Sequence, residues 1–102
     1  MKQIDMVFET LKNLVPKQDY LKLRNDGEFL IVLNTNAEFQ YLNATAKDIY
    51  IQCDGKKTIK DIYEYMLDEY DVDCEVMKHD IISVIREFQW KNLIVLKKLN
   101  IN

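Results

Sequence analysis

The dipeptide Asp26-Gly27 separates two strand-like runs, and this arrangement constrains the fold more than any other feature of the chain. Residues 20–24 precede the dipeptide, and the apolar run of residues 29–33 follows it. Because glycine readily adopts the positive φ that tight turns require, we predict an antiparallel hairpin at this point. The second run is apolar at every position, which favours a strand covered on both faces.

A third strand is predicted at residues 38–42, after a turn at residues 34–37. Its period-two alternation places Phe39 and Tyr41 on one face. We expect this strand to lie at an edge of the sheet, where unpaired N–H and C=O groups can bind an extended peptide. Replacing Gln40 with proline is expected to remove a backbone donor and to weaken such binding.

Helical periodicity replaces the strand pattern from residue 43 onward, and three short helices are predicted. Each is bounded by residues that commonly cap helices: Asn43 and Gly55 for the first, Thr58 with Asp61 for the start of the second, and Asp71 or Asp73 with Asn92 for the third. The apolar run of residues 93–96 is either a fourth strand or a tail packed on the core.

The N-terminal segment has the pattern of an amphipathic helix over residues 2–15. Its apolar positions follow helical spacing at Ile4, Val7, Phe8, Leu11 and Leu14 or Val15. Pro16 is expected to end the helix. The predicted fold is α+β and winged-helix-like, with a three-stranded antiparallel sheet packed on a three-helix bundle and an additional N-terminal helix. We divide the chain into an N-terminal helix (residues 1–17) and a binding domain (residues 18–102).

The residues that usually carry catalysis or bind metals are sparse. The chain has one serine, Ser83, one histidine, His79, and two cysteines, Cys53 and Cys74, without metal-ligand spacing. Its two glycines each have a predicted turn role, which leaves no phosphate-binding loop. We therefore expect neither enzymatic activity nor a cofactor nor a metal.

The formal net charge of −3 is unevenly distributed over the 102 residues. Between residues 61 and 80 the sequence has eight acidic residues and one lysine, Lys78. Because phosphate binding depends on clustered Lys and Arg, the alternative of a winged-helix DNA-binding regulator is disfavoured. No run has the roughly 18 apolar residues of a membrane span, and the N-terminus has no secretory pattern, so we expect a cytoplasmic protein with neither nucleic-acid nor membrane partners.

Several short motifs occur in a fixed order between residues 41 and 94. They are Tyr41 to Ala46, Cys53 to Gly55, Thr58 to Ile62, Tyr70 to Asp73, Asp80-Ile81, and Phe88 to Ile94. In these motifs residues 20–96 resemble the PqqD-like family of peptide chaperones, which are also called RiPP recognition elements. One departure is Asn92, which stands where the family usually has glycine. The helix at residues 2–15 lies outside the resemblance.

The resemblance implies a function in the biosynthesis of ribosomally made, modified peptides. Family members bind the leader segment of a precursor peptide as an added strand, between the third strand and the third helix. They present it to a modifying enzyme such as a radical-SAM protein or a cyclase. The implied peptide-binding residues are Glu38, Phe39, Gln40, Tyr41, Leu42, Met77, Val84, Glu87, Phe88 and Lys91. An exposed edge strand also permits a homodimer.

Overall fold

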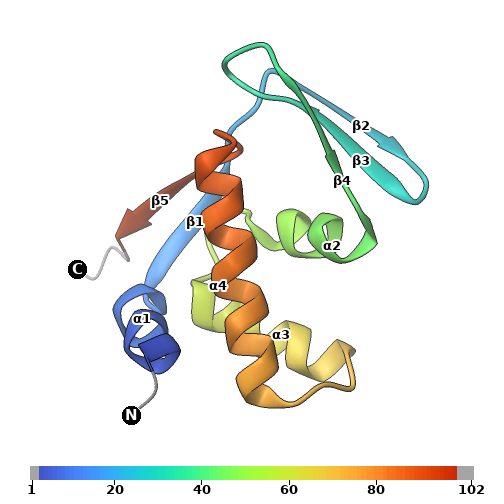
Figure 1. Ribbon diagram of the computed structural model, residues 1–102. Helices are drawn as coiled ribbons and strands as arrows, with labels where there is room; N and C mark the ends of the chain where they lie inside the picture. The colour runs from blue at the N-terminus through green and yellow to red at the C-terminus, as the bar shows by residue number, and fades with distance from the viewer. Residues whose placement is uncertain (1–2, 99–102) are drawn as a thin grey trace.

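The protein was analysed as a computed structural model that describes the backbone of residues 3–98 and the side chains of residues 6–98. The predicted three-stranded sheet is present, with antiparallel strands β2 (Lys22–Asp26), β3 (Phe29–Leu33) and β4 (Phe39–Leu42) in the order β2-β3-β4 (Figure 1). The hairpin turn consists of Gly27 and Glu28, and Gly27 has the positive φ of 81° that was expected of it. Strand β2 lies two residues later than the predicted residues 20–24, and it extends to Asp26, which pairs with Phe29.

The three predicted helices follow as α2 (Ala44–Gln52), α3 (Ile59–Glu69) and α4 (Cys74–Trp90). Their N-terminal caps are confirmed. The Asn43 side chain accepts a hydrogen bond from the Ala46 N–H, Thr58 and Asp61 form a reciprocal capping box, and Asp73 caps α4. Asn92 has the left-handed φ of 56° expected after the end of α4.

The N-terminal segment differs from its prediction. Helix α1 (Gln3–Leu11) is shorter than residues 2–15, and β1 (Leu14–Gln18) follows it. The reason lies in Pro16, which favours an extended conformation for the preceding residue and is accommodated in a strand. Strand β1 pairs antiparallel with β5 (Ile94–Lys98), so the apolar run after α4 is a strand. The side chain of Ile4, part of the predicted apolar face, lies outside the described residues.

The segment α1–β1 packs into the same core as the rest of the chain. Phe8 is buried and meets Tyr63 of α3 edge to face, with ring centroids 5.0 Å apart. The Lys78 ammonium of α4 lies 5.4 Å from the centre of the Phe8 ring. The other side of β1 is bonded to the turn after α2, where the Gly55 N–H donates to the Pro16 carbonyl.

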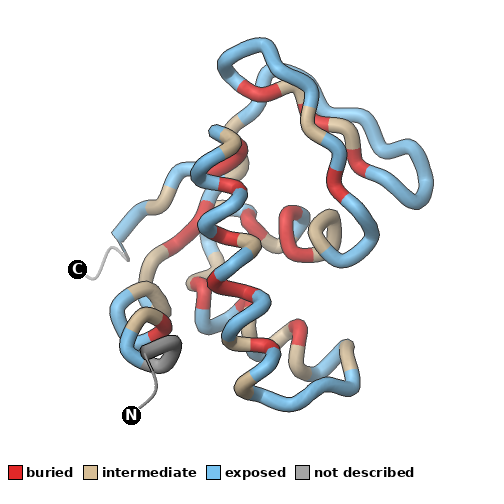
Figure 2. Tube along the Cα trace, in the orientation of Figure 1, coloured by how far each residue is buried: buried red, intermediate tan, exposed pale blue. Residues whose placement is uncertain are grey.

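The core lies between the inner face of the sheet and helices α2, α3 and α4. Figure 2 shows buried residues along α2, α4 and β1, whereas all of β2 is exposed. Strand β3 alternates between buried Leu30 and Val32 and the more exposed Ile31 and Leu33. The prediction that β3 is covered on both faces is therefore wrong, since no described element covers its outer face. Among the described residues, no helix is long and apolar enough to cross a membrane.

Candidate functional site

Strand β4 is the edge strand of the sheet, as predicted, and its hydrogen-bonding pattern identifies the free backbone groups. The Asn34 N–H donates to the Glu38 carbonyl at 2.9 Å, which sets the phase of the ladder. Because bonded and non-bonded pairs alternate along an antiparallel ladder, the Val32–Gln40 pair is bonded and the Ile31–Tyr41 pair is not.

This phase directs the N–H and C=O groups of Phe39 and Tyr41 to the open edge of β4. The backbone groups of Gln40 and Leu42 instead bond to β3. Gln40→Pro would therefore remove a ladder donor, as expected, but that donor bonds to β3 and is not free to bind a peptide. The edge donors available to an added strand are those of Phe39 and Tyr41.

The side chains of β4 alternate across the sheet. Phe39 and Tyr41 lie on the outer face and are 65% and 66% exposed. Gln40 is half-buried and Leu42 is buried on the inner face, where α2 packs against β3 and β4. The prediction that Phe39 and Tyr41 share a face is confirmed, and Leu42 contributes to the core.

Asn34 links the loop before β4 to the C-terminal end of α4. Its fully buried side chain donates hydrogen bonds to the Lys91 carbonyl at 2.7 Å and to Glu38 Oε1 at 3.3 Å. Its Oδ1 accepts from the Asn36 and Glu38 N–H groups. Two predicted site residues, Glu38 and Lys91, are thus brought together around an amide that sequence reasoning assigned only to a turn. An asparagine directly after an apolar strand was the available signal, but it also marks ordinary turns.

The predicted contact residues of α4 divide into two groups. Met77 and Phe88 are buried in the core cluster, where Phe88 meets Tyr50 edge to face at 5.2 Å. Their side chains are not available at the surface for a peptide. Val84, Glu87 and Lys91 recur at i, i+3 and i+7, so they form a stripe beside the buried face. Val84 is partly buried, and Lys91 Nζ forms an ion pair with Glu87 Oε1 at 2.7 Å.

The remaining reactive residues lie apart from this edge. Burial raises the pKa of the Cys53 thiol to about 12, which keeps it protonated, while Cys74 is exposed rather than packed in the core. His79 is solvated beside Asp80 on α4. Within residues 6–98, no group of His, Cys, Asp and Glu side chains could hold a metal ion. Trp90, the last residue of α4, is 87% exposed.

Comparisons with known proteins bear on the fold and family of the chain. The family model described as "Coenzyme PQQ synthesis protein D (PqqD)" matches residues 30–94. A solved structure described as "TbiB1 in Complex with the TbiA(beta) Leader Peptide" superposes with a TM-score of 0.69 at 20% sequence identity. The match covers 76% of this chain and 93% of that one, and it shows a shared fold. The search of curated proteins finds no match.

Proposed function

Since the chain belongs to the PqqD family, whose model matches residues 30–94, we propose that it binds the leader segment of a ribosomally made precursor peptide. The single observation that supports this most strongly is the open edge of β4. There the N–H and C=O groups of Phe39 and Tyr41 have the spacing that an added antiparallel or parallel strand requires. The structural match to a protein in complex with a leader peptide agrees with the proposal.

Backbone pairing gives affinity without sequence selection, so side chains beside the edge must select the peptide. Successive residues of an added strand point to opposite faces of the sheet. On the outer face they would meet the rings of Phe39 and Tyr41. On the inner face they would meet Gln40 and the α4 stripe of Val84, Glu87 and Lys91. Met77, Phe88 and Leu42, also implied by the resemblance, would then act from the core by supporting these surfaces.

The buried Asn34 side chain connects β4 to the end of α4, the two elements proposed to contact the peptide. By bonding to the Lys91 carbonyl and to the Glu38 backbone and side chain, it fixes the start of β4 relative to the end of α4. An edge that is already in place loses less entropy when a peptide binds. The role proposed for the chain is therefore that of a pre-formed receptor.

We further propose that the bound leader is presented to a separate modifying enzyme, such as a radical-SAM protein or a cyclase. The role assigned to the chain is binding, and the chemistry belongs to that partner. The DNA-binding alternative gains no support, because the exposed side of α4 carries Asp80 and Glu87 beside its few basic residues.

Nuclear magnetic resonance with amide hydrogen exchange tests the peptide-binding proposal. The isotope-labelled chain is titrated with a synthetic candidate leader segment, chosen from short precursor genes found by inspecting the neighbourhood of its gene. We expect the amides of Phe39 and Tyr41 to become protected from exchange, while the amide of Gln40 is protected before and after binding. A scrambled leader of the same composition is the control for selection. Binding that leaves the Phe39 and Tyr41 amides unprotected would reject strand addition at β4.

A further inference from the structure

Over strands β3 and β4, the outer face of the β2-β3-β4 sheet is apolar, whereas an uncovered sheet face is usually polar. In an antiparallel sheet with one face in solvent, residues alternate along each strand, and those that point toward solvent are usually polar. Here the outward positions of β3 and β4 are held by Ile31, Leu33, Phe39 and Tyr41. A contiguous apolar surface of this kind commonly marks an interaction site.

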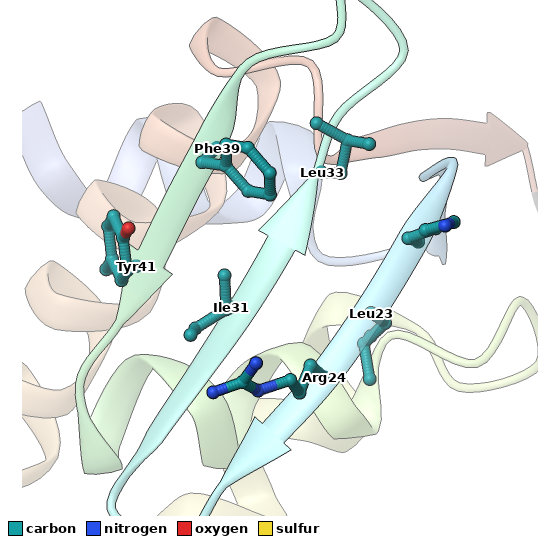
Figure 3. Close-up of a pocket in the computed structure, with 7 residues that line it drawn as sticks. Leu23, Arg24, Ile31, Leu33, Phe39 and Tyr41 are labelled. Carbon is teal, nitrogen blue, oxygen red and sulfur yellow. The ribbon is translucent and has the colours of Figure 1, made fainter.

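These side chains are part of the lining of an open hollow of about 430 Å³ on the sheet surface, which we call the outer-face hollow. Its lining residues are Lys22, Leu23, Arg24, Ile31, Leu33, Phe39 and Tyr41 (Figure 3). Ile31 and Leu33 lie on the central strand, and Figure 3 shows the ring of Phe39 leaning toward Leu33. The volume falls in the range of about 300–1,000 Å³ that is typical of pockets for small ligands, so the hollow can accept a large side chain.

The charged residues of the outer-face hollow are both basic. Lys22 and Arg24 lie on β2, opposite the aromatic residues of β4, and no acidic residue is part of the lining. The guanidinium of Arg24 lies 3.5 Å from Asp26 Oδ1 but remains 73% exposed. In a chain with a net charge of −3, this is a local surface that favours an acidic partner.

We propose that the outer-face hollow docks an acidic segment of a partner protein, with an aromatic or large aliphatic side chain inserted over Ile31 and Leu33. Carboxylates flanking that side chain pair with Lys22 and Arg24. The hollow is continuous with the proposed peptide edge, since both include β4. A partner docked there would lie beside the bound leader, as a modifying enzyme must, so we assign this surface to that enzyme; the assignment rests on the proposed function.

Two other occupants fit less well. A leader peptide added to β4 would meet Phe39 and Tyr41 at the rim of the hollow, but β4 itself would separate it from Ile31 and Leu33 on β3. A second copy of the chain would bring another Lys22 and Arg24 to the same surface, and like charges disfavour that contact.

A defined probe tests this docking surface. The labelled full chain is titrated with the capped pentapeptide of sequence Asp-Glu-Phe-Glu-Asp, and amide shifts are followed by nuclear magnetic resonance. The comparison peptides replace Phe with Ala or replace the acidic residues with Lys. We expect shifts concentrated at residues 22–24, 31–33 and 39–41, with affinity at least fivefold lower for either comparison peptide. Absence of shifts, or equal binding of the Lys peptide, would overturn the proposal.

Charge reversal provides the matched variants. Lys22→Glu/Arg24→Glu should weaken binding of the acidic peptide at least fivefold, whereas Lys60→Glu/Lys97→Glu, which changes two exposed lysines elsewhere, should change it less than twofold. If both double variants lost affinity for the acidic peptide equally, binding would depend on net charge alone, and the proposed docking surface would be contradicted. Shifts at the same residues on raising the chain concentration alone would identify a second copy as the occupant and contradict the proposal.

The same variants separate this inference from the proposed function. Lys22→Glu/Arg24→Glu should leave leader binding and protection of the Phe39 and Tyr41 amides unchanged. If the leader binds at β4 but the acidic probe does not bind at the hollow, only the docking inference fails. If the probe binds but the leader does not, the proposed function fails and the hollow still accepts acidic segments.

Discussion

At the scale of single residues, the buried amide of Asn34 has the most consequences for the proposed site. It accepts hydrogen bonds from the Asn36 and Glu38 N–H groups of its own loop and donates one to the Lys91 carbonyl at the end of α4. The sequence predicted a turn here but not this function, because the partner carbonyl belongs to Lys91, 57 residues away. Such a contact leaves no local pattern.

Asn34→Ala should therefore lower the free energy of unfolding by about 2–4 kcal/mol, since buried groups left unsatisfied cost about 1–3 kcal/mol each. Asn34→Asp keeps the acceptor for the Asn36 and Glu38 N–H groups and loses the donor to Lys91. Because it also turns a buried carboxylate oxygen toward the Lys91 carbonyl and Glu38 Oε1, it should lower stability at least as much as Asn34→Ala and weaken leader binding by displacing the start of β4. Urea denaturation and calorimetry measure the two effects. A loss below about 0.5 kcal/mol for Asn34→Ala would contradict the structural role.

Asp54 gives a second prediction at this scale, on acid stability. Partial burial opposes its ionisation, but hydrogen bonds from the Lys57 side chain and from the Lys57 and Lys56 N–H groups outweigh this and lower its pKa to about 2. A depressed carboxyl pKa stabilises the folded chain fully above the unfolded value near 4, and the contribution disappears as pH falls toward 2.

The carboxyl resonance of Asp54 should thus titrate near pH 2 in the folded chain. Asp54→Asn should lower stability at neutral pH and reduce the loss of stability between about pH 4 and pH 2. A midpoint near the ordinary value of 3.9 would show that these hydrogen bonds do not favour the charged form.

At the scale of elements, local signals were predictable and long-range pairings were not. The caps Asn43, Thr58 and Asp73 act within their own turns, so the sequence located the starts of α2, α3 and α4. The end of α1 was misplaced because Leu14 and Val15 satisfy a helical pattern as well as a strand. Their pairing with β5, about eighty residues later, decides between the two.

The packing of α1 leads to a prediction with a control on the same helix. Phe8→Ala should lower the free energy of unfolding by about 3 kcal/mol, because Phe8 is buried against Tyr63 and Lys78. Met6→Ala changes a 58% exposed side chain and should have little effect. Thermal and urea denaturation would measure both. Equal, small effects would show that α1 is not part of the cooperative core.

At the scale of the whole molecule, the sheet has two distinct surfaces. The free edge of β4 is the proposed site for a peptide strand, and the outer face is the proposed docking surface for a partner protein. The sequence predicted the edge strand, its aromatic face and the family. The phase of the ladder could not be predicted, because it depends on the Asn34–Glu38 pairing, and neither could the exposure of Ile31 and Leu33 on an uncovered face.

The most direct test of the central claim compares two substitutions of Tyr41 by calorimetry with the leader peptide. Tyr41→Ala removes the ring and keeps the edge N–H, whereas Tyr41→Pro removes both. Proline is tolerated where the N–H faces away from the sheet, so the fold should persist, in contrast to Gln40→Pro, which breaks a bond to β3. We predict that Tyr41→Pro binds the leader about tenfold more weakly than Tyr41→Ala, at similar stability. Equal affinities of the two variants would contradict binding by strand addition at β4.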